Sequence, residues 1–548
     1  MTVDIASLVS NNLDIWTTAV DRKSGSGRGG GKRISLYGID RLRSLIVDLA
    51  VRGKLTSQQP DEEPAAVALA KFAKARRRKI ELGQARKPKA LLPFPANLPN
   101  LPEGWVWTQL GTIAEISPSN SADDQVDASF VPMALISTRI DGVHETKTRK
   151  WSEIKKGFTH FSEGDIGLAK ITPCFENGKA AIFENLTNGI GAGTTELHVA
   201  RPWSDDVNPR YLLLTMKTTS YLHQGAAEMT GTAGQKRVTR SYFESSPLPL
   251  PPLAEQQRIV AKVDELMALC DALEMESAAA MAAHQMLVEA LLATLTTSAD
   301  TADLATNWAR LETHFDSLFI TEASVDALKQ TVIDLAMRGR LSSDVEFDWT
   351  PKPLGAFVKA VSAGWSPKCI ETPRMGNDWG VLKVSAVTWG QFRPAENKQL
   401  PPSLRPRPEI EVRPGDFLIS RANTADLVAR SVVVPKGAPT KLMMSDKIIR
   451  FRFSEKIDAQ YVSLFHASTT ARTYYARVAG GTSSSMKNVS QGQIRALQIP
   501  VPPLPEQRSI VAKVDAMMVL CDALKARIAE AAQTQCHLAD TIIQQAVV

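Results

Sequence analysis

One stretch of the sequence occurs twice: PPLAEQQRIVAKVDELMALCDAL at residues 251–273 and PPLPEQRSIVAKVDAMMVLCDAL at residues 502–524. Proline is accepted at the start of a helix but not in its interior, and a glutamate in the first turn complements the helix dipole. Each copy therefore predicts a helix that begins at its paired prolines. Since the copies are 251 residues apart, the chain is predicted to be internally duplicated.

Apolar side chains recur in both predicted helices at the alternating three- and four-residue spacing of a coiled-coil seam. The seam positions are Ile259, Val263, Leu266, Cys270 and Leu273 in the first copy and Ile510, Val514, Met517, Cys521 and Leu524 in the second. Two equal seams in one chain most simply pack against each other. The two seam cysteines are then expected to be small core residues.

A second pair of repeats completes the predicted frame. DLAVRGKL at residues 48–55 matches DLAMRGRL at residues 334–341, and each ends a predicted helix with an apolar stripe. Between the helices lie two segments in which short apolar runs alternate with Gly, Pro, Asn and Asp, a pattern typical of strands. The chain is thus predicted to be a helical frame and a module, repeated once, with a duplicated frame and divergent modules.

The predicted boundaries follow from these repeats. They are an N-terminal helical region with a basic linker (1–97), a first module (98–250), a central helical region (251–344), a second module (345–501) and a C-terminal coiled-coil helix (502–548). Residues 298–318 are expected to be a polar connector. A glycine-rich loop at residues 25–32 has the wrong spacing for a phosphate-binding loop.

The composition is that of a soluble globular protein, with 44% hydrophobic and 22% charged residues. The net charge of +6 permits an anionic partner. Residues 71–89 contain nine Lys or Arg and one acid, which predicts either a solvated face or phosphate contacts. Five cysteines without a C-x-x-C pair, no basic start followed by an apolar run, and no long apolar segment together predict a cytoplasmic protein without a membrane span.

A constant frame that carries two unlike modules predicts that two different targets are bound at a fixed separation. A helix of roughly 40 residues spans roughly 60 Å, so the frame could set the gap between two half-sites on duplex DNA. A scaffold that holds two protein-binding modules explains the pattern equally well. The repeats alone leave both interpretations open.

The frame resembles the specificity subunit of Type I restriction–modification systems. The resemblance rests on the two duplicated helix starts, VDLAVRGKL, IDLAMRGRL, LPEGWVWTQLGTIAEI and TGTAGQKRVTRSYF. It implies a mixed α/β fold in which two target recognition domains each read half of a bipartite DNA sequence, held by an antiparallel coiled coil. It also implies two methyltransferase subunits and restriction/translocase subunits as partners in defence against foreign DNA. Those partners, and not this chain, are expected to use S-adenosylmethionine, and ATP with Mg.

The resemblance implies no catalytic residues, and the sequence can be searched for them. No Pro-Pro pair lies in the Asp/Asn/Ser-Pro-Pro-aromatic context of an amino-methyltransferase, and no F-x-G-x-G loop is present. Asp141 followed by Glu153-Ile-Lys155 has the order of a nuclease metal site, but such triplets are common by chance. The histidines are too scattered to predict a metal site. A stand-alone DNA-modifying enzyme therefore remains only an alternative.

Sequence readout needs hydrogen-bond donors and acceptors at base edges, and phosphates attract Lys, Arg, Ser and Thr. The predicted DNA-contacting residues are Lys170, Thr172, Asn177, Lys179, Gln235, Lys236, Arg237 and Arg240 in the first module and Arg421, Asn423, Thr424, Ser484, Lys487, Asn488 and Gln491 in the second. Lys170 aligns with Arg421, and Lys236 with Lys487. Because residues common to both modules cannot distinguish unlike targets, these pairs are predicted to contact phosphates.

Overall fold

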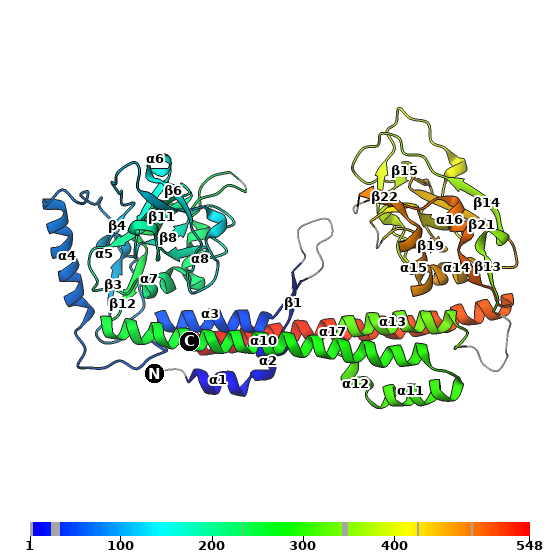
Figure 1. The fold of residues 1–548 in the computed structure, drawn as a ribbon, viewed down its shortest axis with the longest axis horizontal. Coiled ribbons are helices and arrows are strands. Elements are labelled where there is room, and N and C mark those ends of the chain that lie inside the picture. Colours follow the sequence, from blue (N-terminus) through cyan, green and yellow to red (C-terminus); the bar gives the residue numbers. More distant parts are fainter. Residues whose placement is uncertain are drawn as a thin grey trace. The chain divides into compact units, whose positions relative to one another are not determined.

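A computed structural model describes residues 4–23, 33–232, 234–341, 349–424, 427–483 and 486–547. These residues form two compact units, Met1–Ala279 with Ala532–Val548 and Ala280–Ala531 (Figure 1). Each unit contains one module and one part of the helical frame. The glycine-rich loop considered above lies outside the described residues.

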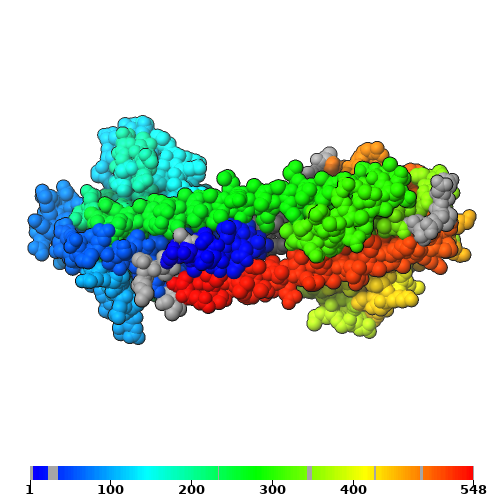
Figure 2. All heavy atoms as spheres, turned by 90° about the horizontal axis from the view of Figure 1, so that it is seen from below, coloured from blue at the N-terminus to red at the C-terminus, as the bar shows by residue number. Residues whose placement is uncertain are grey.

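In the first unit, helices from distant parts of the chain share one apolar core. The core is formed by α1 (Ile5–Asn11), α2 (Leu13–Thr18), α3 (Tyr37–Val51), the start of α10 (Leu253–Thr297) and the end of α17 (Leu504–Val547). Figure 2 shows the dark blue α1 and α2 beside the red end of α17. A short hairpin, β1 (Asp21–Lys23) with β2 (Arg33–Ser35), separates α2 from α3.

The second unit repeats this arrangement. Here α13 (Glu322–Met337) takes the place of α3 and packs with the start of α17 and the end of α10. In both units the start of one long helix lies with the end of the other, which is the arrangement of an antiparallel coiled coil. The mixed helix-and-sheet fold with long coiled-coil helices is therefore present.

The two seams do not pack against each other as the sequence analysis expected. Ile259, Val263, Leu266 and Cys270 are buried in the core of the first unit, and Leu273 lies at its edge. Ile510, Val514 and Cys521 are buried in the second unit, with Met517 and Leu524 at the edge of that core. Both seams lie in the first halves of antiparallel helices, so each faces the last turns of the other helix and a short frame helix instead. Burial raises the pKa of the Cys270 thiol to about 11, as expected for a core residue.

The first module is built on three small sheets. Its strands are β3 (Val106–Gln109), β4 (Ala114–Ile116), β5 (Asp127–Val131), β6 (Lys147–Lys150), β7 (Thr159–Ser162), β8 (Ile166–Ala169), β9 (Ala180–Ile182), β10 (Ile190–Gly193), β11 (Leu197–Pro202) and β12 (Pro247–Leu250). Its helices are α5 (Leu110–Ile113), α6 (Trp151–Ile154), α7 (Pro209–Met216), α8 (Thr219–Ala227) and α9 (Arg240–Ser245), with 3-10 turns η1 (Met133–Leu135) and η2 (Thr187–Gly189). The strand orders are β6-β5-β10-β7, β4-β11-β8-β9 and β12-β3.

The second module has related sheets. Its strands are β13 (Pro351–Pro353), β14 (Val358–Ala363), β15 (Gly380–Leu382), β16 (Asn397–Gln399), β17 (Phe417–Ser420), β18 (Ala422–Asn423), β19 (Ser431–Val433), β20 (Leu442–Met443), β21 (Ile448–Phe453), β22 (Gly480–Ser483), β23 (Met486–Asn488) and β24 (Gln498–Pro500). Its helices are α14 (Ala459–Ala467), α15 (Thr469–Val478) and α16 (Gln491–Ala496), with 3-10 turns η3 (Leu354–Phe357), η4 (Val384–Ala386) and η5 (Pro408–Ile410). The strand orders are β14-β21-β17-β19, β16-β15-β20, β18-β23-β22 and β13-β24.

The two modules share much of their strand pairing despite unlike sequences. In each, the last strand pairs antiparallel with the first, β12 with β3 and β24 with β13. In the described residues of each module two strands also pair in parallel, β10 with β5 and β15 with β20. Pairing the first strand with the last brings the two ends of each module together at the helical frame.

Three further findings change the expectations drawn from the sequence. The connector at 298–318 is largely helical, as α11 (Thr301–Thr313) and α12 (Phe315–Leu318), because Asp300 caps α11 and Leu311 packs into the core. The helix α4 (Ala65–Glu81) packs on the core of the first module through Ala65, Ala68 and Phe72. The compact body of that module therefore begins well before residue 98.

The long helix α10 is apolar enough, by length and composition alone, to cross a membrane. The sequence had predicted no such segment. Part of its apolar surface packs against the other frame helices in both units. A helix of a protein core meets the same criterion, so α10 by itself is weak evidence for a membrane span.

Candidate nucleic-acid interface

A buried glutamine at equivalent positions joins each module to a long helix. The side-chain oxygen of Gln256 accepts a hydrogen bond from the backbone N–H of Asn208 at 2.8 Å, and its amide nitrogen donates to the first proline of its repeat at 2.9 Å. Gln507 makes the same two bonds, to the N–H of Asp458 at 2.7 Å and to the equivalent proline at 2.8 Å. Both side chains are fully buried, so water cannot replace these bonds.

A duplicated aspartate makes a second joint between frame and module. The Asp48 carboxylate on α3 accepts from the backbone N–H of Thr219 at 3.2 Å. Asp334 on α13 accepts from the backbone N–H and the hydroxyl of Thr469 at 2.8 and 2.6 Å. The threonines are the first residues of α8 and α15, where a carboxylate complements the helix dipole. Burial raises the pKa of Asp48, and the bonds from Thr219 oppose this shift.

Glu255 in the first long helix also contacts the first module. Its carboxylate accepts from the indole N–H of Trp105 at 2.8 Å, from the Gln58 amide at 3.1 Å and from the Thr56 hydroxyl at 3.3 Å. Burial raises the pKa of Glu255, and these donors counteract that effect. The helix start therefore binds both the segment after α3 and the first residues of the module.

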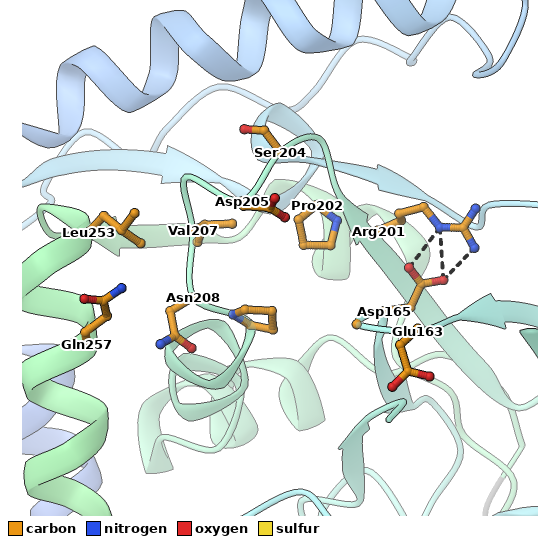
Figure 3. A pocket seen from close by; sticks show the side chains of 12 residues that line it. Glu163, Asp165, Arg201, Pro202, Ser204, Asp205, Val207, Asn208, Leu253 and Gln257 are labelled. Carbon is orange, nitrogen blue, oxygen red and sulfur yellow. Dashed lines mark hydrogen bonds and ion pairs between the residues drawn. The ribbon is translucent and has the colours of Figure 1, made fainter. Parts of the chain in front are cut away.

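The matched Gly-Asp positions hold a buried ion pair in each module. Asp165 pairs with Arg201 at 2.7 Å, and Asp416 pairs with Arg450 at 2.9 Å. Figure 3 shows the first pair at one side of a cavity of about 360 Å³, with Leu253 of α10 on the opposite side. Burial raises the pKa of Asp165, and the Arg201 guanidinium opposes that shift. Both acids are held in ion pairs within their own modules.

The predicted contacts of the first module lie on two adjacent loops. One loop follows β8, and the other covers residues 229–238. The N–H of Val238 donates to the carbonyl of Lys170 at 2.8 Å, and the N–H of Thr172 donates to the carbonyl of Lys236 at 2.9 Å. The backbone thus brings together Lys170, Thr172, Asn177, Lys179, Gln235, Lys236 and Arg237.

The side chains of this group differ in how they are engaged. Lys179 donates to the Met133 carbonyl at 2.9 Å, and Arg237 makes a two-pronged pair with Glu196 at 2.8 and 2.9 Å. Arg240 lies apart on α9 and pairs with Glu244 at 2.8 Å. The more exposed side chains, which make no side-chain hydrogen bond in the described part of the chain, are Asn177, Gln235 and Lys236.

The second module shows the same backbone joint. The N–H of Val489 donates to the carbonyl of Arg421 at 2.9 Å, as Val238 does to Lys170. The sheet β18-β23-β22 then places Asn423 opposite Lys487, whose ammonium donates to the Gly481 carbonyl at 2.9 Å.

The other predicted residues of this module are less closely grouped. Asn488 is exposed on β23, Gln491 is exposed at the start of α16, and Thr424 is half-buried just after β18. Ser484 lies outside the described residues. The alignment of Lys170 with Arg421 thus corresponds to one backbone position that both modules share at the start of each group.

A half-buried lysine, which no sequence pattern indicated, lies beneath the first group. The Lys217 ammonium donates to the carbonyls of Thr138, Arg139 and Gly178. Gly178 lies between Asn177 and Lys179, so this lysine holds the predicted contact loop in place. Burial lowers the pKa of Lys217 to about 7. A lysine at the end of a helix is indistinguishable in sequence from a solvated one, so no pattern predicted this role.

The basic helix α4 presents a second cationic surface in the first module. Lys71 pairs with Glu63 and Asp206, and Lys79 lies 6.0 Å from the centre of the Trp203 ring. The remaining cations of residues 71–89 have no ion pair within the described ranges; they are Lys74, Arg76, Arg77, Arg78, Arg86, Lys87 and Lys89. This surface can attract phosphate without specifying a sequence.

The candidate nuclease triplet is not assembled in the structure. Lys155 pairs with Asp124 and Asp141 pairs with Arg139, so the triplet that ends at Lys155 does not assemble. Among the residues that the structure describes, no group of three or more His, Cys, Asp or Glu could hold a metal ion.

Comparison with known proteins decides the family. The Type I restriction modification DNA specificity domain matches residues 102–280 and 414–533. The chain belongs to this family. It is 43% identical over 99% of its length to the whole of the Type I restriction enzyme EcoEI specificity subunit of Escherichia coli. It is 38% identical over its full length to the whole EcoAI specificity subunit, also of Escherichia coli.

A solved structure agrees in fold. A chain from a study of complex assembly and conformational transition of the type I R-M system aligns with 82% of this chain and 99% of its own length. Its TM-score is 0.51 at 21% identity. The protein is thus a specificity subunit of a Type I restriction–modification system, as its frame sequences predicted.

Proposed function

We propose that this specificity subunit reads a bipartite DNA sequence, one half with each module, and directs methyltransferase and restriction/translocase subunits to it. The supporting observation is that two modules with divergent exposed donors are anchored on the frame by the same buried bonds. A shared anchor presents both modules to the duplex in the same way, while unlike loops select unlike bases.

In this proposal the chain itself recognises DNA and catalyses nothing. The methyl donor S-adenosylmethionine, and ATP with Mg, are bound by the two methyltransferase subunits and the restriction/translocase subunits. The base to be methylated is flipped into the methyltransferase, because its amino group cannot be reached inside the duplex. The complex acts in the cytoplasm, where it meets foreign DNA.

The predicted donors divide into two proposed classes. Asn177 and Gln235 in the first module and Asn423 and Asn488 in the second have amide groups that can donate to and accept from base edges. Lys170, Lys236, Arg421 and Lys487 are proposed to bind phosphates. Phosphate contacts predict a steep loss of affinity with rising salt.

The test is to co-express the chain with its methyltransferase subunit in a host without DNA methylation and to map modified bases across that genome. A two-part motif with a constant gap is expected. A continuous motif would mean that one module does not read DNA. An assembled complex that methylates nothing would favour the scaffold alternative.

The enzyme alternative has its own test. The isolated chain, incubated with DNA and S-adenosylmethionine, is expected to transfer no methyl groups. Methylation by the isolated chain would contradict the proposal that catalysis belongs to the partner.

A further inference from the structure

Two arginines lie near one tryptophan ring in the second module, and the charge of a third acts on one of them. The guanidinium carbon of Arg430 lies 6.0 Å from the centre of the Trp389 ring, and that of Arg472 lies 5.8 Å from it. Arg393 completes the group, and its positive charge acts on Arg430. The residues come from the turn after η4, the strand start at β19 and the helix α15, so only the tertiary structure brings them together. We call Arg393, Arg430 and Arg472 the arginine cluster.

The side-chain hydrogen-bond partners of the arginine cluster among the described residues are uncharged. Arg472 donates to the side-chain oxygen of Gln330 at 2.9 Å, and Arg393 donates to that of Gln391 at 3.2 Å. Both acceptors are uncharged amides. Within the part of the chain that the structure describes, no carboxylate forms an ion pair with any of the three guanidinium groups.

Part of the Arg430 guanidinium group lacks a hydrogen-bond partner in the described part of the chain. Its Nε is buried and has no hydrogen-bond partner among the described residues. Burial, followed by repulsion from Arg472 and Arg393, lowers its pKa. A half-buried guanidinium with an unused donor and two like-charged neighbours is unfavourable unless an anion joins them.

The first module lacks this feature at the equivalent turn. There Arg139 follows η1 and pairs with Asp141 at 2.8 Å and with Asp271 of α10 at 3.9 Å. Its charge is neutralised within the protein. A cluster of arginines without an ion pair among the described residues is therefore a property of the second module and not a consequence of the shared fold.

We propose that the arginine cluster binds a phosphate of the DNA backbone beside the half-site that the second module reads. The inference rests on the proposed DNA-binding function and adds a site to it. Planar guanidinium forks match the geometry of phosphate oxygens, and several can converge on one phosphate group.

The position of the arginine cluster supports DNA as the source of that phosphate. The carbonyl of Arg430 accepts from the N–H of Ser420, which directly precedes the predicted phosphate contact Arg421. Arg472 lies on α15, which leads into β22 of the sheet that carries Asn423 and Lys487 (Figure 1). The backbone at Arg430 thus lies beside the strand that leads into the predicted contact residues, and a phosphate bound by the arginine cluster would be close to that strand. An acidic protein surface would not explain this proximity.

The test compares the wild-type complex with one that carries Arg430→Gln and Arg472→Gln. Both are assembled with the methyltransferase subunit and titrated with a duplex that contains the mapped motif. We expect about tenfold weaker binding, since bonds to charged groups are among the stronger hydrogen bonds. The slope of log affinity against log salt should become shallower by about one for each phosphate that the double variant no longer neutralises, while the recognised sequence stays the same.

Two further variants sharpen the test. Arg430→Lys keeps the charge without the fork and should lose less affinity than Arg430→Gln. Arg407→Gln removes an exposed arginine that stacks on Trp365 in the same module, 4.1 Å from its ring centre, and should leave affinity nearly unchanged. An equal loss for Arg407→Gln would mean that net charge alone acts, and would overturn the site.

Neutral methylphosphonates, placed one at a time in the duplex, locate the phosphate. At one or two adjacent positions in the second half-site they should weaken the wild type but not the double variant. Unchanged affinity of the double variant would overturn the inference and leave the proposed function intact. Loss of subunit assembly with normal DNA affinity would also overturn it, in favour of an acidic protein partner. Absence of sequence-selective binding by the wild type would overturn both proposals.

Discussion

The two modules differ most where they are exposed and least where they meet the frame. Tyr211 donates to the carbonyl of Pro249 at 2.8 Å, and Tyr461 donates to that of Pro500 at the same distance. The buried glutamines and the aspartates of the frame are repeated in the same way. Duplication has preserved the bonds that position each module, because the loss of any one leaves a buried polar group unsatisfied.

The cationic groups of the two modules are less alike than these bonds. The first module has the basic helix α4 and a half-buried lysine beneath its contact loop, while the second has the arginine cluster near Trp389. At the position of Arg430 the first module has Lys179, because Ala169 donates to the Lys179 carbonyl as Ser420 does to that of Arg430. The Lys179 ammonium, however, donates to the Met133 carbonyl. The two modules are therefore held on the frame in the same way, while each uses its own cationic residues to attract an anion.

The largest expected effect comes from exchanging a whole module. Replacing residues 64–250 by the same segment of a relative with another target should change one half of the methylated motif completely. Because α4 packs on the module core, an exchange of residues 98–250 alone should give a less stable protein with the same new half-site. Methylation mapping and thermal unfolding measure the two effects. A change in both halves would contradict independent reading.

The next effect tests the equivalence of the buried glutamines. Gln256→Ala and Gln507→Ala should each lower the free energy of unfolding by about 3 kcal/mol, since each leaves a buried N–H and a buried carbonyl unsatisfied. Denaturant unfolding measures the loss, and Gln257→Ala, an exposed neighbour, is the matched control. A loss of stability in only one of the two variants would show that the two glutamines are not equivalent.

Low pH should lower the stability of each module through one buried histidine. Burial lowers the pKa of His198 to about 4 and that of His466 to about 3. The unfolded chain binds these protons near pH 6.5, so stability is lost as the pH falls below 6.5, by about 2 kcal/mol for each histidine at pH 5. The loss from His198 levels off near pH 4, whereas that from His466 continues to about pH 3.

Neutral variants isolate this contribution. His198→Gln and His466→Gln should each flatten the dependence of unfolding free energy on pH between about 6.5 and 5. An unchanged slope in both variants would show that other groups cause the acid sensitivity.

The smallest effect distinguishes the aspartates of the frame. Asp334→Asn should lower the unfolding free energy by about 1 kcal/mol and Asp48→Asn by less, because Asp334 accepts two bonds from Thr469 and Asp48 accepts one longer bond from Thr219. Thr469→Val removes the hydroxyl bond to Asp334, so the second joint should then contribute about as much to the unfolding free energy as the first. Thermal unfolding of the four chains measures the order, and a larger loss for Asp48→Asn would contradict it.

Much of the frame was predictable because its information is local. Prolines, a first-turn glutamate and an apolar spacing of three and four residues mark the start of α10 as clearly as that of α17. The helix α11 carried the same kind of pattern in Leu304, Trp308 and Leu311, with Asp300 as its cap, but the polar residues around it masked the pattern. The sequence indicated which residues lie on the contact loops but not which loops lie side by side, because Val238 meets Lys170 only in the folded chain.

By itself, the sequence determined the duplication, the helical frame, the two divergent modules and the family, because each is recorded in residue spacing or in repeated motifs. Only the tertiary structure decided which helix faces each seam, which donors are already engaged by Glu196 or Glu244, and where Lys217 and the arginine cluster lie. These features depend on interactions between residues far apart in the chain. Their free energy comes from burial and from the local balance of charge, which no single segment of sequence contains.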